Sequence, residues 1–417
     1  MPLRARFRTL PALPGLAAAA AIALAGCGGG GHLAVSTTGS TGSSVTPPVS
    51  GGSGGHASGG QSRPDFPLVA TKNTTRVAGN PIQNAAWVAL AVYPSAIPGT
   101  HPPAVALVST SDWQGAIAAT SLMAPPFRAP VLLSHPGALT GTTRSALHTL
   151  APTGAHSLGG AQVVRVGSVA AAPGLRTTSI AGSDPYTLAA SIDHFEAQAT
   201  GRERSDVVVV SANSPGFAMP AAGWAAESGD PILFVNSSSV PGPTAAALKA
   251  HHHPHIYVLG SASAIPGSVL AKLGRYGTVK RVSGSDPAAS SVAFASYRDP
   301  PCPSNQACGH VPNSFGWAIR SPGHAYVLIN ASDPLDAAAA AALSGSGGYG
   351  PQLLVQNGNT LPKSVLNYFL NYATPGYTTQ GPTAAVYNHG WLIGPPSAIS
   401  LDVQAQIDSL LEAVPQR

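Results

Sequence analysis

The chain has 417 residues, of which 44% are hydrophobic, 6% aromatic and 9% charged, with 47 Gly and 40 Pro. This apolar fraction supports a large core and excludes disorder throughout, and the low charge excludes a coiled coil. The net charge of +5 includes Arg4, Arg6 and Arg8 at the start, so the rest of the chain is close to neutral and no nucleic-acid partner is predicted.

Residues 1–26 are predicted to be a signal peptide. The three arginines precede an apolar run over residues 16–25 that is too short to span a membrane. The run ends in Leu24-Ala25-Gly26-Cys27, which resembles a bacterial lipobox. The resemblance implies export, acylation of the Cys27 thiol with palmitate or a similar chain, and a lipid anchor in the cell membrane, facing the wall or the outer envelope. The alternative is an ordinary cleaved signal peptide in which Cys27 has no role.

Residues 27–66 are predicted to form a flexible tether. Between residues 28 and 62 the chain is rich in Gly, Ser and Thr and holds no acidic residue. Such a segment buries too little apolar surface to offset the entropy lost on ordering. We interpret it as a spacer between a membrane and a folded body.

The remaining chain repeats itself about every hundred residues. We divide it into repeat 1 (residues 67–178), repeat 2 (179–280) and repeat 3 (281–417), the last with an insertion around two cysteines. Each repeat has an opening tetrapeptide, a β-rich run and a Pro-led apolar strand. In the order of the repeats, the openings are Arg76-Val77-Ala78-Gly79, Ser179-Ile180-Ala181-Gly182 and Arg281-Val282-Ser283-Gly284, the β-rich runs are residues 105–109, 207–211 and 326–330, and the Pro-led strands are residues 130–133, 231–234 and 351–354.

Helices are expected between these strands. Asn80-Pro81, Asp184-Pro185 and Asp286-Pro287 each combine an N-cap residue with a proline suited to the first helical position. Ala-rich stretches follow the β-rich runs. Strands that are apolar throughout and alternate with helices predict the α/β class, with parallel sheets covered on both faces.

The inserted cysteines are Cys302 and Cys308. In an exported protein such a pair predicts a disulfide within the loop. The alternative, half of a metal site, lacks a second pair of ligands at the usual spacing.

Together these segments resemble the bacterial cell-wall-binding repeat family, type 2. The resemblance rests on the three openings and on Asp336-Ala337-Ala338-Ala339-Ala340, which is similar to the family's helix motif. It implies three tandem Rossmann-like repeats about a pseudo-threefold axis that hold surface proteins to anionic wall polymers. The basic residue that the family usually places after the opening acid is absent at Asp184 and Asp286, and Ser179 replaces an arginine. These changes remove cations that would pair with such a polymer.

Five residues are candidates for ligand binding. Asp112, Asp333 and Asp336 follow β-rich runs, at the edge where α/β sheets bind ligands, while Arg76 and Arg281 belong to the openings. Asp112 and Asp333 have an alternative role as N-caps of the following helices.

No metal, cofactor or catalytic residue is assigned from the sequence. The run His251-His252-His253-Pro254-His255 invites a metal interpretation, but adjacent side chains diverge and no acid or cysteine lies nearby in the sequence. We interpret it as a surface segment at the end of a helix.

The predicted function is that of a membrane-anchored envelope lipoprotein whose repeats bind a cell-wall glycopolymer non-covalently. An envelope hydrolase acting on wall material and a solute-binding lipoprotein are the alternatives, so enzymatic activity stays open at this point.

Overall fold

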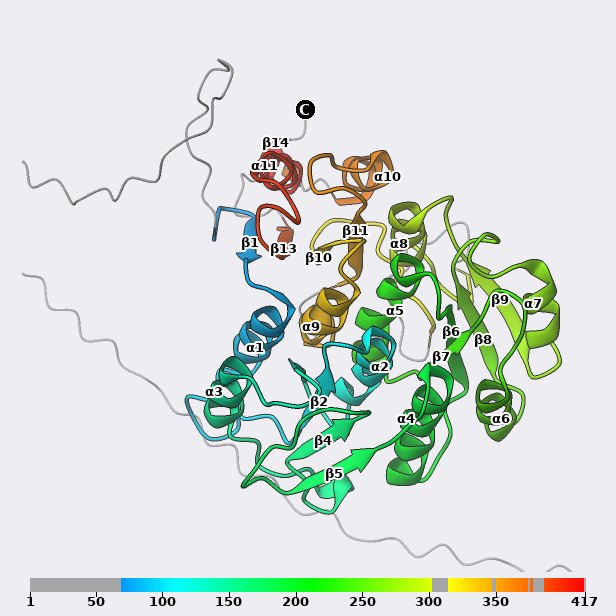
Figure 1. Ribbon diagram of the computed structural model, residues 1–417. Coiled ribbons are helices and arrows are strands. Elements are labelled where there is room, and N and C mark those ends of the chain that lie inside the picture. Colours follow the sequence, from blue (N-terminus) through cyan, green and yellow to red (C-terminus); the bar gives the residue numbers. More distant parts are fainter. Residues whose placement is uncertain (1–68, 302–313, 347–349, 374–375, 378–385, 416–417) are drawn as a thin grey trace, which may run out of the picture. The chain divides into compact units, whose positions relative to one another are not determined.

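The computed structural model describes residues 69–301, 314–346, 350–373, 376–377 and 386–415 (Figure 1). Contacts divide the chain into residues 1–62 and 63–417, and all described residues belong to the second unit. The expected signal peptide, tether, lipid attachment at Cys27 and disulfide between Cys302 and Cys308 lie outside the described residues.

Three parallel sheets of four strands carry the fold. Their strand orders are β3-β2-β4-β5, β7-β6-β8-β9 and β11-β10-β13-β1, which we call the first, second and third sheets. The strands alternate with helices along the chain, so the predicted α/β class is confirmed. The strands are β1 (Thr74–Val77), β2 (Val105–Ser109), β3 (Val131–Ser134), β4 (Val163–Val166), β5 (Thr177–Ile180), β6 (Asp206–Ser211), β7 (Ile232–Val235), β8 (His255–Leu259), β9 (Thr278–Val282), β10 (Ala325–Asn330), β11 (Gln352–Val355) and β13 (His389–Ile393), with a two-stranded pair of β12 (Gly376–Tyr377) and β14 (Val414–Pro415).

The third sheet is completed by the first strand of the described chain. β1 pairs with β13 in parallel and takes the edge position that β5 and β9 hold in their own sheets. The second and third opening tetrapeptides therefore begin on the outer strand of the sheet that holds the preceding β-rich run. The first begins on β1, the outer strand of the third sheet, which holds the last β-rich run. In the third sheet, that strand comes from the other end of the described chain.

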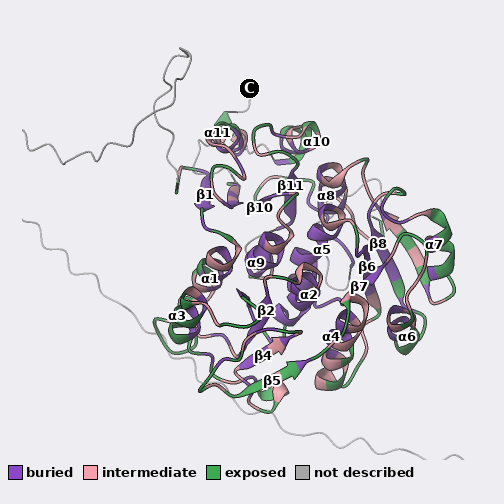
Figure 2. Ribbon diagram, viewed as in Figure 1, coloured by how far each residue is buried: buried purple, intermediate pink, exposed green. Residues whose placement is uncertain are grey.

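Three equivalent helices fill the space between the sheets (Figure 1). α2 follows β2, α5 follows β6 and α9 follows β10. α5 packs against α9, and both contact η1, the continuation of α2. Their small residues permit close approach: a Cβ atom added to Gly223 would lie 2.7 Å from the Ser344 Oγ. Figure 2 shows α5 and α9 largely buried. These helices are α2 (Trp113–Ala118) with the 3-10 turn η1 (Ala119–Met123), α5 (Pro215–Ser228) and α9 (Pro334–Ser344).

Three further helices connect neighbouring sheets. α1, α4 and α8 each pack on the central helix of the sheet they leave and on a strand of the next sheet, β3, β7 and β11 in turn. Their expected caps are present, because the side chains of Asn80, Asp184 and Asp286 accept hydrogen bonds from first-turn backbone amides. The remaining helices cover the outer faces. Bounds are α1 (Pro81–Val92), α3 (Gly141–Leu150), η2 (His156–Leu158), α4 (Pro185–Thr200), α6 (Gly242–Ala250), α7 (Gly267–Leu273), α8 (Pro287–Ala295), α10 (Lys363–Tyr368), the π-helical turn η3 (Phe369–Ala373) and α11 (Leu401–Leu410).

Among the described residues, no helix combines the length and the apolar character needed to cross a bilayer. The division of the body into three repeats at the expected boundaries stays a prediction.

Candidate functional site

A crevice with several polar side chains opens at the carboxyl edge of the third sheet. It has a volume of about 590 Å³ and lies where β10 and β13 end. The chain leaves β10 for β11 on one side, while β13 lies on the other, and such a reversal of strand order is where open α/β sheets bind ligands. The side chains that line it include Asn80, Asn330, Asp333, Asp336 and Ser397.

Asp336 lies at the bottom of the crevice, in the first turn of α9. It is only 3% exposed, and its Oδ1 accepts a hydrogen bond of 2.9 Å from the Asn84 Nδ2. Asn84 is fixed in turn, because its Oδ1 accepts a 2.8 Å hydrogen bond from the Gly79 backbone amide. Burial raises the pKa of Asp336 to about 7, so this carboxyl is partly protonated at neutral pH.

Asp333 stands at the rim. It occupies the N-cap position of α9, but its side chain makes no capping hydrogen bond. Burial raises the pKa of Asp333 above its usual value. The neighbouring Asn330 is already engaged, since its Nδ2 donates to the Ala398 carbonyl at 2.7 Å. Asp333 is thus placed to accept hydrogen bonds from a ligand.

The equivalent crevice of the first sheet is closed. Asp112 caps α2, its Oδ1 accepting a 2.8 Å hydrogen bond from the Gly115 amide, and burial raises its pKa. Gly115 is equivalent to Asp336, because each lies three residues after the N-cap of its helix. Leu188 is equivalent to Asn84, because each lies three residues after the proline that begins its helix. A Cβ atom added to Gly115 would lie 2.8 Å from the Leu188 Cδ2, so an apolar side chain fills the space.

The second sheet shows a similar closure. Phe217 stands in the place of Asp336, and its side chain approaches Gly260, the glycine that follows β8. Of the five predicted ligand residues, the structure therefore brings Asp333 and Asp336 together and places Asp112 in a different sheet.

The two predicted arginines bind the chain's own carbonyl groups. Arg76 is buried and donates from Nε to the Gln404 Oε1 (2.9 Å) and from Nη1 to the Gly394 carbonyl (3.0 Å). Burial lowers its pKa to about 10. Arg281 donates from Nη1 to the Gly260 carbonyl at 2.8 Å and from Nη2 to the Ile265 carbonyl at 2.5 Å. In this arrangement both side chains hold the loop that follows the neighbouring strand.

Sequence reasoning missed the corresponding arginine of the first sheet. Ser179 replaces the arginine on β5, but Arg165 lies directly beside it on β4 and donates to the Val169 carbonyl. A lone arginine within the apolar run of β4 was the available signal.

Comparison with known proteins supports this fold. Residues 179–270 match the family model for cell wall binding domain 2. No curated protein sequence matches the chain. Cwp6 from Clostridium difficile aligns with a TM-score of 0.63 at 15% identity over 84% of this chain and 51% of that protein. Cwp8 from the same organism aligns with a TM-score of 0.60 at 16% identity over 82% of this chain and 52% of that protein. The chain thus spans about half the length of these two structures, and at such identity the likeness shows the fold alone.

Proposed function

We propose that the folded body, of which residues 179–270 match the family model for cell wall binding domain 2, binds a cell-wall glycopolymer non-covalently. The family match is the observation that carries this proposal. The alignment with Cwp6 and Cwp8 over more than four fifths of the chain supports the same fold for the remaining parts.

We place the polymer in the crevice of the third sheet. Its lining residues offer carboxyl, amide and hydroxyl groups, and none of these described lining residues is Lys or Arg. Such groups suit the hydroxyls of a sugar, which donate to carboxylate and amide oxygens. A phosphate-rich chain would instead need cations.

Binding to purified wall sacculi tests the crevice through two matched substitutions. Asp333→Ala removes an acceptor that does not cap its helix, so we expect about tenfold weaker retention with an unchanged melting temperature. Asp112→Ala removes a cap in the closed crevice of the first sheet, so we expect about 1 kcal/mol lower stability with unchanged retention. Equal retention of both variants would refute this location.

A salt series distinguishes the two kinds of ligand. Retention that changes little with ionic strength supports hydrogen bonding to neutral sugar hydroxyls, whereas a steep fall indicates a polyanion held by surface cations. Failure of the unaltered body to bind sacculi at low salt would remove the adhesion function itself.

We further propose that Cys27 carries the lipid that anchors the protein to the cell membrane. The apolar run followed by Leu24-Ala25-Gly26-Cys27 supports this assignment. Labelling of growing cells with radioactive palmitate is expected to mark the unaltered protein and not Cys27→Ser, which should appear in the medium or the wall fraction. Labelled Cys27→Ser would contradict the assignment.

A further inference from the structure

A second polar cluster lies beside the second sheet, away from the crevice. It joins Asp193 of α4, Glu203 in the segment between α4 and β6, and His251 at the C-cap of α6. One ligand atom from each residue lies within 4.8 Å of the others. The side chains of His251 and Asp193 are 0% and 6% exposed, and that of Glu203 is 29% exposed. The cluster is therefore buried and opens toward solvent on the Glu203 side.

The two ring nitrogens of His251 have different surroundings. Nδ1 lies 2.8 Å from the Arg204 backbone carbonyl, which can only accept, so this nitrogen carries a proton. Nε2 faces carboxylates: it is 2.9 Å and 3.0 Å from the Asp193 oxygens and 3.9 Å from the Glu203 Oε2. A metal-binding histidine usually donates one ring N–H to a backbone carbonyl or carboxylate and binds the ion through the other nitrogen, so the Nδ1 contact leaves Nε2 as the ligand atom.

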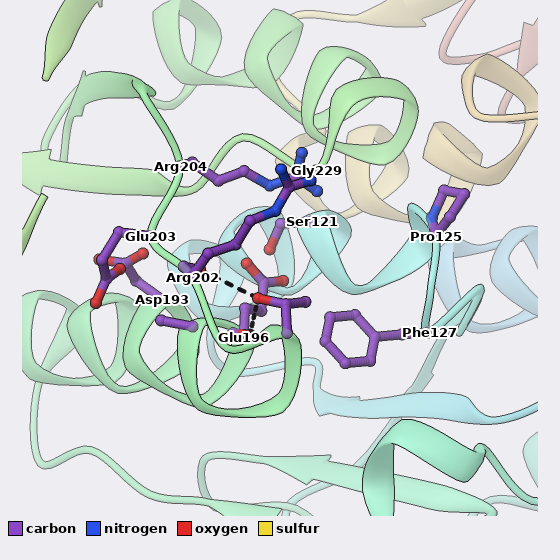
Figure 3. A pocket seen from close by; sticks show the side chains of 11 residues that line it. Ser121, Pro125, Phe127, Asp193, Glu196, Arg202, Glu203, Arg204 and Gly229 are labelled. Carbon is purple, nitrogen blue, oxygen red and sulfur yellow. Dashed lines mark hydrogen bonds between the residues drawn. The ribbon is translucent and has the colours of Figure 1, made fainter. Parts of the chain in front are cut away.

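A small cavity adjoins the cluster (Figure 3). Asp193, Glu196 and Glu203 line it, and its volume of about 10 Å³ suits one ion or one water molecule. Figure 3 shows the Glu196 side chain rising from α4 toward Ser121. Glu196 is 8% exposed, and the Ser121 hydroxyl is a hydrogen-bond partner of its carboxyl group, whose Oε1 makes no further hydrogen bond to a described residue. The Oε1 can therefore accept a hydrogen bond from a water molecule in the cavity.

We propose that this cluster binds one divalent transition-metal ion of the Zn²⁺ type. The ligands are the His251 Nε2 and one carboxylate oxygen each from Asp193 and Glu203. The fourth position holds a water molecule that donates to the Glu196 Oε1. Two carboxylates balance the two charges of the ion, and the imidazole favours zinc-like ions over Mg²⁺ and Ca²⁺, which prefer oxygen ligands alone.

The ion would join three segments that are otherwise linked by the hydrogen bonds of His251 to Asp193 and to the Arg204 carbonyl. It links the last turns of α4, the segment leading into β6 and the end of α6. The unfolded chain holds no preformed site, so the ion binds the folded body alone. Its binding free energy therefore adds to the stability of the fold. The site is independent of the polymer crevice.

Thermal unfolding of the full chain tests the site. After treatment with a chelator, added Zn²⁺ is expected to raise the melting temperature progressively with its concentration, and Mg²⁺ is not. Glu203→Gln removes one ligand and only the 3.9 Å ion pair with His251, so the metal-free melting temperature should fall slightly at most. Zinc affinity measured by calorimetry should fall at least about tenfold. The Co²⁺-loaded protein should show a visible absorption band that Glu203→Gln lacks.

The pair of His255 and Asp206 provides the matched control. It belongs to the same histidine run, with 2.9 Å between the His255 Nδ1 and the Asp206 Oδ1, but it has one carboxylate and an exposed imidazole. Asp206→Asn should therefore leave the zinc-induced shift unchanged. Absence of a shift in the unaltered protein would overturn the proposal. So would a shift that survives Glu203→Gln, because the exposed histidines would then be the binding groups.

Discussion

At the scale of single residues, two positions decide which crevice stays open: the one held by Asp336, where the second sheet has Phe217, and the one held by Asn84. Asn84, Leu188 and Ser290 each lie three residues after the first proline of α1, α4 and α8. Asn84 donates to Asp336, whereas Leu188 fills the first crevice with an apolar side chain. Asp336 was predictable because it follows a β-rich run. Asn84 was not, because it lies 252 residues away in the sequence.

Asp336 contributes a pH dependence of stability that one substitution should reduce. Folding raises the pKa of this carboxyl from 3.8 to about 7, mainly through burial. The folded state therefore keeps a proton that the unfolded state releases, and stability falls as the pH rises from about 4 to 7, by up to about 4 kcal/mol for this group. Denaturant unfolding across this range should show a flatter profile for Asp336→Asn. An equal slope in both proteins would contradict the assignment.

His251 shows the limit of sequence reasoning at the same scale. The histidine run was interpreted as a surface segment because no acid stands nearby in the sequence. Its partner Asp193 lies 58 residues earlier, and the two meet only because α4 packs against α6. Ligand spacing along the chain cannot detect a cluster whose members come from different elements.

At the scale of elements, the central helices depend on small residues. α5 and α9 are Ala-rich, and the positions facing the partner helix leave little room. Ala-rich composition after each β-rich run predicted close packing on a sheet. These helices pack on one another because of how the three sheets are arranged. Amino-acid composition does not reveal that arrangement.

Gly223→Val tests this contact. Its Cβ atom would lie 2.7 Å from the Ser344 Oγ and 3.1 Å from the Gln352 Cγ, so the added methyl groups overpack the interface. We expect a loss of about 1–3 kcal/mol in unfolding free energy. Gly242→Val, at the start of α6, is the control, because no atom lies within 4 Å of the added Cβ. Similar stability of the two variants in denaturant titrations would disprove the tight contact.

At the scale of the whole described body, the third sheet joins segments from both ends of the chain. β1 supplies its edge strand, and the Asn73 backbone amide donates to the Asp408 Oδ1 of α11 at 2.9 Å. The Asn73 Nδ2 also donates to the Glu412 Oε2 at 2.8 Å. The three sheets therefore close into a ring of contacts in which the third sheet needs β1.

Truncation measures this closure. A chain that begins at Arg63 keeps β1, whereas one that begins at Ala78 loses it together with Arg76. The shorter chain leaves the Gly394 carbonyl and the Gln404 side chain unpaired, so we expect it to lose at least about 3 kcal/mol of stability. Coincident unfolding midpoints of the two chains would show that β1 is dispensable.

The sequence by itself determined the α/β class, the order of strands and helices and the caps of α1, α4 and α8, because these depend on local periodicity and on residues next to each other in the chain. It also supplied two acids of the crevice, since the end of a strand is a local feature. Only the tertiary structure decided that β1 completes the third sheet, that Arg76 and Arg281 hold loops, and that Asp193, Glu203 and His251 converge. These outcomes depend on packing between segments that are far apart in the sequence. The contacts that stabilise this packing follow no fixed spacing along the chain.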